Sequence, residues 1–209
     1  MASSINTILM INSPNETVSQ VSFLDKLRLS TSPLHKQLES VPLSQVVVSS
    51  EITVQKYAEY LLVMEGVVRD VEAKVYPLIS TFISDIDQRK KWSSIQDDLK
   101  VLGFSVLNET TAFDADFEIP FALGIVYVLE GSTLGGRVIL KNIEKQLGFN
   151  ADNGAKYFSG YKENTGSLWK SFLFDMVQYE QEHDCGDAII EGANFAFGII
   201  HKHFESFKR

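Results

Sequence analysis

Apolar residues recur at helical spacing through most of the chain, and no segment keeps the strict alternation of a half-buried strand. Residues 22–40 carry such a stripe, made of Leu24, Leu27, Leu34 and Leu38. This stripe predicts a first helix, in which Pro33 introduces a kink or a restart capped by Ser32. A second helix is expected over residues 53–76, ending at Pro77. Residues 46–48 are flanked by serine and are expected to form a loop.

The second half of the chain predicts four more helices. They are expected over residues 87–102, from Pro120 to Gly148, over residues 165–183, and from Asp187 to the C-terminus. Gly103 and Gly148 are favourable terminators because glycine adopts the left-handed conformation at low cost. The sequence therefore predicts an all-α, compact multi-helix bundle with one core.

Length and composition indicate one domain. The chain has 209 residues, of which 44% are hydrophobic, enough for one well-buried core. Residues 21–209 are assigned to this helical domain, with no linker inside it. Residues 1–20 are rich in Ser and Asn and are expected to form a flexible N-terminal extension.

Charge and cysteine content limit the partners and the compartment. The net charge of −8 argues against nucleic acid or an anionic membrane as a partner. The longest apolar run, residues 121–129, is about half of a membrane span. The single cysteine, Cys185, indicates a reducing compartment, and no basic start precedes the short apolar patch near the N-terminus. A cytoplasmic location is expected.

The most informative segment is residues 127–137, Tyr-Val-Leu-Glu-Gly-Ser-Thr-Leu-Gly-Gly-Arg, inside a strong helical pattern. Each glycine costs a helix about 1 kcal/mol relative to alanine. At about 100° per residue, Gly131, Ser132, Gly135 and Gly136 share one face, which makes a flat strip. Such a strip serves either close helix packing or the approach of a flat ligand such as a porphyrin.

His35 is the best candidate for a metal ligand among the four histidines. Glu39 follows it by one helical turn and can hold the second ring nitrogen, an arrangement common in metal-bound imidazoles. Arg28 precedes it by two turns and can pair with an anionic ligand edge. His201 and His203 lie near the C-terminal helix end and are expected to be solvated or to interact with that helix end.

Three blocks together resemble the heme oxygenase family. Residues 27–39 are similar to its proximal helix, and residues 127–138 to its distal helix. The segment that contains Phe158, Tyr161, Trp169 and Phe172 is similar to a signature of the bacterial subgroup that supplies bilin to bacteriophytochromes. The resemblance covers residues 24–197, which is most of the domain.

The resemblance implies a bundle that holds heme between proximal and distal helices and opens it to biliverdin with release of CO and iron. His35 would ligate the iron and Glu39 would interact with His35. Arg28 and Lys170 would meet the propionates. Gly131, Ser132, Gly135 and Gly136 would line the oxygen side, where a bound hydroperoxide attacks the ring. Molecular oxygen and an external electron donor, a reductase or ferredoxin, are implied, and a bacteriophytochrome is a candidate bilin recipient.

Ser132 departs from the animal-type pattern, which has an acid at this position to organise pocket water. A neutral hydroxyl can orient water but cannot supply an anchoring charge. Ser132 therefore also motivates an alternative, a non-catalytic heme- or bilin-binding protein on the same fold.

Two further alternatives involve other chemistry. Glu180 and His183 have the Glu-x-x-His spacing of di-iron bundles, but no second copy of the pair occurs in the sequence. Cys185 is the only candidate for the nucleophile of a thiamin-degrading hydrolase. It is expected at a helix junction, where a structural thiol is the simpler interpretation.

Overall fold

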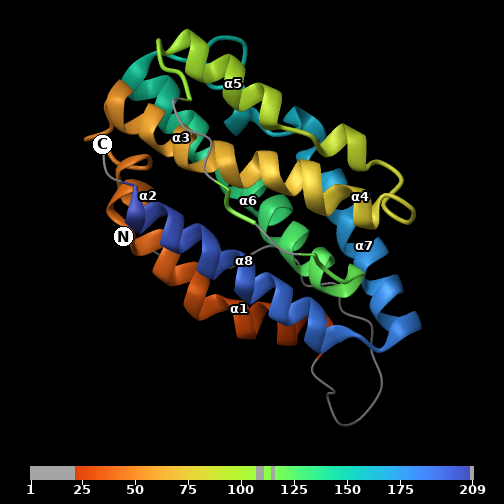
Figure 1. The fold of residues 1–209 in the computed structure, drawn as a ribbon. Coiled ribbons are helices and arrows are strands. Elements are labelled where there is room, and N and C mark those ends of the chain that lie inside the picture. The colour runs from red at the N-terminus through yellow and green to blue at the C-terminus, as the bar shows by residue number, and fades with distance from the viewer. Residues whose placement is uncertain (1–21, 107–110, 114–115, 208–209) are drawn as a thin grey trace, which may run out of the picture.

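All regular secondary structure is helical in the computed structural model, which describes residues 22–106, 111–113 and 116–207 (Figure 1). This confirms the all-α fold. The extension expected at residues 1–20 lies outside the described residues.

Helix α1, Phe23–Ser40, begins where expected, because Ser22 accepts a hydrogen bond from the Asp25 backbone N–H at 3.2 Å. The restart expected at Pro33 is wrong, since α1 continues through this residue. Pro33 cannot donate to the carbonyl of Leu29. Leu29 is 75% exposed, so water can reach that carbonyl and the helix tolerates the loss. A short helix that the sequence did not predict, α2, Pro42–Val46, follows.

The second predicted helix is longer than expected. Helix α3, Val54–Asp70, passes into a π-helical turn, η1, Val71–Val75, and then into α4, Tyr76–Ile79. Pro77 therefore lies in the first turn of α4, directly after the π-helical turn, instead of ending the helix.

The remaining α-helices agree with the prediction except at residues 87–102, where a 3-10 turn is separated from a shorter α-helix. In chain order the remaining elements are η2 Ile86–Arg89, α5 Trp92–Val101, α6 Ile119–Leu147, η3 Tyr157–Ser159, η4 Lys162–Asn164, α7 Thr165–His183 and α8 Gly186–Ser206. The sequence did not predict the 3-10 turns η3 and η4, which lie between α6 and α7. Gly103 and Gly148 have φ angles of +78° and +77° and act as the expected terminators.

Helix α6 lies at the centre of the bundle and packs most extensively against α8, and α1 lies along the other side of α8 (Figure 1). The first half of α6 touches α8 through backbone atoms. A side chain at Gly124 would overlap the carbonyl oxygen of Ile189, and one at Gly192 would overlap that of Phe121. These two glycines allow the two helices to cross at very short distance.

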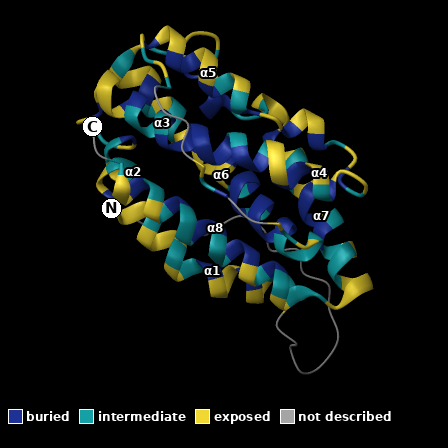
Figure 2. Ribbon diagram, in the orientation of Figure 1, coloured by how far each residue is buried: buried dark blue, intermediate teal, exposed yellow. Residues whose placement is uncertain are grey.

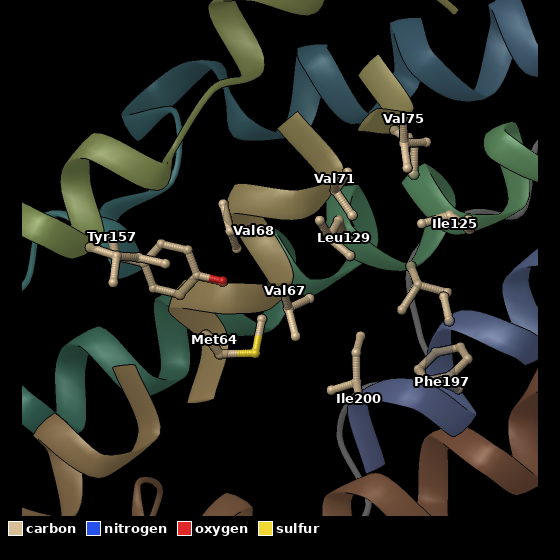
Figure 3. Packing of buried hydrophobic residues seen from close by; sticks show 14 of the residues in the cluster. Met64, Val67, Val68, Val71, Val75, Ile125, Leu129, Tyr157, Phe197 and Ile200 are labelled. Atoms are coloured by element: carbon tan, nitrogen blue, oxygen red, sulfur yellow. The ribbon is translucent and has the colours of Figure 1, made fainter. Parts of the chain in front are cut away.

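The core lies where α3 and η1 meet α6 and α8. Buried positions line the inside of the bundle and exposed positions its outside (Figure 2). Val71 of η1 lies beside Leu129 of α6 (Figure 3), and Val67 of α3 and Ile200 of α8 belong to the same buried cluster. Among the described helices only α6 is long and apolar enough to cross a membrane, and half of its most apolar stretch is buried inside the protein. Its apolar composition is therefore accounted for by its central position.

Candidate functional site

His35 stands on the outer face of α1 with 55% of its side chain exposed. Its Nδ1 lies 3.6 Å from Oε2 of Glu39, which is an ion-pair distance and longer than a hydrogen bond. The ring also packs edge-on against Phe197 of α8, at 5.5 Å between centroids. With Nδ1 beside Glu39, Nε2 is the nitrogen available to a metal.

Arg28 lies on α1 and forms an exposed ion pair with Asp25, at 3.5 Å between Nη1 and Oδ1. The charge of Arg28 on α1 also acts on a residue of the central helix α6. Burial raises the pKa of the Tyr127 hydroxyl on α6, and the positive charge of Arg28 acts against this rise. Arg28 is therefore within electrostatic reach of the residue where the glycine-rich segment begins.

The glycine-rich segment does not present one uniform strip. A Cβ at Gly131 would lie 3.5 Å from Cη2 of Trp169 on α7, and one at Gly136 would lie 3.3 Å from the Phe158 carbonyl oxygen. These two glycines accommodate neighbouring elements, as in the helix-packing interpretation. A Cβ at Gly135 would have no atom within 4 Å, so Gly135 faces open space.

Ser132, Leu134 and Val138 are exposed positions of α6 near Gly135 in the sequence, and together with Gly135 they are here called the open face of α6. Leu134 is 42% exposed and Val138 55% exposed, although both are large and apolar. The open face thus has room for a ligand at Gly135, which has no side chain, and exposed apolar side chains at Leu134 and Val138. Such a surface suits a flat, apolar ligand.

Aromatic side chains from α6 and α7 border the same region. Tyr127 and Trp169 have ring centroids 5.5 Å apart, and Trp169 stacks on Phe172 at 6.2 Å. Lys170 follows Trp169 on the exposed side of α7 and forms no ion pair with another described residue. Its charge is therefore available to an anionic group.

A buried polar network behind the glycine-rich segment was not predicted. Arg89 and Glu130 are both 0% exposed, and their Nη1 and Oε2 atoms are 2.6 Å apart. Arg89 also donates to both carboxylate oxygens of Asp85, at 2.7 and 2.8 Å, and to the carbonyl of Leu168 at 3.1 Å. The guanidinium thus joins η2, α6 and α7.

Two further side chains complete this network around Glu130. The Tyr161 hydroxyl donates to Oε1 of Glu130 at 2.6 Å, and Nζ of Lys91 lies 3.7 Å from the same oxygen. Burial lowers the pKa of Lys91, while the negative charge of Glu130 opposes that effect. The sequence did contain a signal: Glu130 is an acidic residue inside an apolar helical run, and such a charge requires a buried partner.

The alternative chemistry finds little support in the geometry. His183 stacks on Tyr179 at 4.0 Å, and its Nδ1 is 2.9 Å from the Tyr179 carbonyl oxygen. No group of three or more potential metal ligands occurs among the described His, Cys, Asp and Glu residues. Burial and the charge of Glu180 raise the pKa of the Cys185 thiol, which disfavours a nucleophilic thiolate.

The other two histidines lie on α8. His201 forms an ion pair with Glu205, at 3.4 Å between Nδ1 and Oε2. Partial burial lowers the pKa of His203, which is therefore less solvated than the sequence suggested.

Comparisons with known proteins agree on the fold. The family model described as heme oxygenase matches residues 89–206, which is more than half of the chain and runs from η2 through α8. No curated protein sequence matches the chain.

Three solved structures are similar to the described fold. The heme oxygenase of Neisseria meningitidis, solved with NO and CO, has a TM-score of 0.71 and 21% identity, over 88% of this chain and 93% of that chain. Heme oxygenase-1 of the cyanobacterium Synechocystis, in complex with heme, has a TM-score of 0.72 and 15% identity, over 88% of this chain and 91% of that chain. Heme oxygenase 2 of Chlamydomonas reinhardtii, without heme, has a TM-score of 0.70 and 15% identity, over 89% of this chain and 97% of that chain.

Proposed function

Because the chain belongs to the heme oxygenase family, we propose that it binds heme and opens it to biliverdin with release of CO and iron. The reaction takes place in the cytoplasm and consumes molecular oxygen and electrons from a separate reductase or ferredoxin. The protein is of the bacteriophytochrome-associated type, with a bacteriophytochrome as the recipient of the bilin.

The observation that carries this proposal is the open face of α6. Gly135 leaves room for a group to approach the backbone, and the exposed Leu134 and Val138 supply apolar contact on the same stretch. A macrocycle that covers Leu134 and Val138 would remove their apolar surface from water, at about 25 cal/mol per Å². The residues present therefore suit heme.

The remaining residues have complementary roles. Bound heme supplies the iron at which oxygen is activated and the ring that is cleaved. The His35 imidazole holds the iron through the nitrogen opposite Nδ1, and Glu39 keeps the ring oriented. Arg28 and Lys170 are exposed cations that can pair with the propionates. The Ser132 hydroxyl donates to the Leu129 carbonyl at 2.7 Å, so its lone pairs remain as acceptors for water.

Contacts between the sequence blocks support the proposed subgroup. Phe158 and Trp169 belong to the segment that resembles the bacteriophytochrome-associated signature. Phe158 packs on Gly136 and Trp169 on Gly131, so this segment and the glycine-rich segment are complementary in shape.

The test is a hemin titration followed by turnover. Wild-type protein should give a sharp Soret band and, with oxygen and an electron donor, biliverdin. His35→Ala should shift or lose the Soret band while the protein stays folded, because the side chain is half exposed. His183→Ala is the matched control and should behave like the wild type, since the hydrogen bond and the ring stacking of this histidine are both to Tyr179, one turn earlier on the same helix.

Two results would contradict parts of this proposal. An unchanged Soret spectrum in His35→Ala would remove His35 as the iron ligand. A wild-type protein that binds hemin but forms no biliverdin with a competent donor would be a heme- or bilin-binding protein, which is the alternative that Ser132 motivates.

A further inference from the structure

A small cavity lies beside α6, on the side that faces α3 and η3. Its volume is about 30 Å³, room for one or two water molecules. The polar residues that line it are Tyr60, Lys91, Ser132, Thr133 and Tyr157. Ser132 also belongs to the open face, so one residue connects the cavity lining with the surface at which heme is proposed to bind.

The hydroxyls of Tyr60 and Tyr157 have no hydrogen-bond partner among the described residues that line this cavity. The ammonium of Lys91 forms an ion pair with one carboxylate, that of Glu130, and can donate further hydrogen bonds. The Tyr157 side chain points toward α3, the helix that carries Tyr60 (Figure 3). Buried polar groups nearly always have a partner, and a buried water typically makes two to four hydrogen bonds. Water in the cavity would satisfy these groups together.

The local charge favours water over an anion as the occupant. Nζ of Lys91 is 3.7 Å from Oε1 of Glu130, and the negative charge of Glu72 also acts on it. These carboxylates offset the attraction that Lys91 would exert on an anion. The other ionisable groups clustered around this pair are Tyr76, Arg89 and Tyr161.

The hydrogen-bond chemistry of the lining then fixes the orientation of the water. An ammonium only donates, so it engages the water oxygen and directs both water hydrogens away from itself. The Ser132 and Thr133 hydroxyls donate to the carbonyls of Leu129 and Glu130, at 2.7 and 2.6 Å, and therefore offer acceptor lone pairs. Lys91 and Ser132 are complementary partners for one water.

We infer that this cavity is an ordered-water site anchored by Lys91, and that Lys91 is a positioning residue that directs water hydrogens toward Ser132 and the open face. The inference rests on the proposed function for its catalytic consequence. Lys91 supplies the anchoring charge that a serine at position 132 lacks. With the water oxygen held by the buried cation and one hydrogen donated to Ser132, the other hydrogen is left to donate toward the open face.

The test compares Lys91→Met and Lys91→Arg with Lys90→Met, a control on the exposed neighbour that pairs with Asp87. All three should bind hemin like the wild type. Wild-type turnover should fall at alkaline pH as Lys91 loses its charge. The fall should come at a pH below 10.5, the ordinary pKa of a lysine, because burial lowers the pKa of Lys91. Lys91→Met should be about 10- to 100-fold slower than the wild type at neutral pH, and its rate should show no alkaline fall. Lys91→Arg should restore the rate and lose the alkaline fall, because guanidinium stays charged. Lys90→Met should match the wild type.

Two readouts can overturn the inference. If Lys91→Met keeps the wild-type rate and pH profile, Lys91 has no positioning role. If Lys91→Met does not fold, Lys91→Arg decides, since retention of the alkaline fall refutes the role. A crystal structure of the heme-free protein must also show water within hydrogen-bond distance of Lys91 Nζ. Its absence refutes the inference whatever the activity, whereas a wild type without biliverdin formation refutes the proposed function.

Discussion

The open space at Gly135 predicts that stability and function respond in opposite directions to added side-chain atoms. Gly135→Ala should raise the free energy of unfolding by about 0.5–1 kcal/mol, because alanine favours the helix interior by this amount. No steric cost opposes the gain, since a Cβ at this position has no atom within 4 Å. At Gly136 the same change places a Cβ 3.3 Å from the Phe158 carbonyl oxygen, so crowding should cancel the gain.

A larger side chain tests the functional half of this prediction. Gly135→Leu would occupy space that heme needs, and overpacking typically costs about 1–3 kcal/mol. Hemin affinity should therefore fall by about 5- to 150-fold. Gly166→Leu is the control, because Gly166 lies on α7, is exposed, and also has no atom within 4 Å of an added Cβ.

Urea denaturation of the heme-free protein and Soret titration with hemin measure the two halves separately. A loss of stability in Gly135→Ala would show that the position is not open. Wild-type hemin affinity in Gly135→Leu would show that heme does not lie on this face of α6. Equal losses of affinity in Gly135→Leu and Gly166→Leu would mean that the assay reports a general effect.

Three other predictions concern the buried network, the pH dependence and the helix crossing. Arg89→Met should lower the free energy of unfolding by about 3–5 kcal/mol, because it leaves the Glu130 carboxylate buried without its main partner. A loss under about 1 kcal/mol in urea denaturation would contradict this prediction. Burial raises the pKa of Tyr60 from 10.0 to about 12, so the unfolded chain loses this proton first and stability should fall as pH rises through that range. A urea midpoint that stays constant across this range, measured beside tyrosinate absorbance, would refute the assignment. Gly192→Val should cost more than about 3 kcal/mol in thermal unfolding, because its side chain would overlap the Phe121 carbonyl.

The helices could be predicted from the sequence because their apolar spacing and terminators act locally. Ser22, Gly103 and Gly148 mark helix ends through their own backbone and side-chain chemistry, and the structure confirms them. Pro33 and Pro77 misled the prediction because the cost of proline depends on surroundings. Exposure at Leu29 and a preceding π-helical turn absorb that cost here, and neither can be read from local spacing.

The candidate site was predictable only in part. The sequence identified Gly135 and His35 by residue type and spacing, and the structure places both on exposed surface. It could not separate Gly135 from Gly131 and Gly136, because Trp169 and Phe158 reach these glycines from distant parts of the chain. Lys91 was missed for the same reason, since nothing local distinguishes it from its exposed neighbour Lys90.

The backbone crossing at Gly124 and Gly192 also constrains how α6 can move. From Gly124 to Gly135 the helix extends about 16 Å. If this stretch of α6 rotates as a rigid unit about the crossing, Gly135 moves the furthest. A rotation of only about 5° there would displace Gly135 by about 1.4 Å. A change on α8 at this crossing would therefore alter the space beside Gly135, where heme is proposed to bind. The size of that space depends on the distant helix crossing as well as on the residues around Gly135.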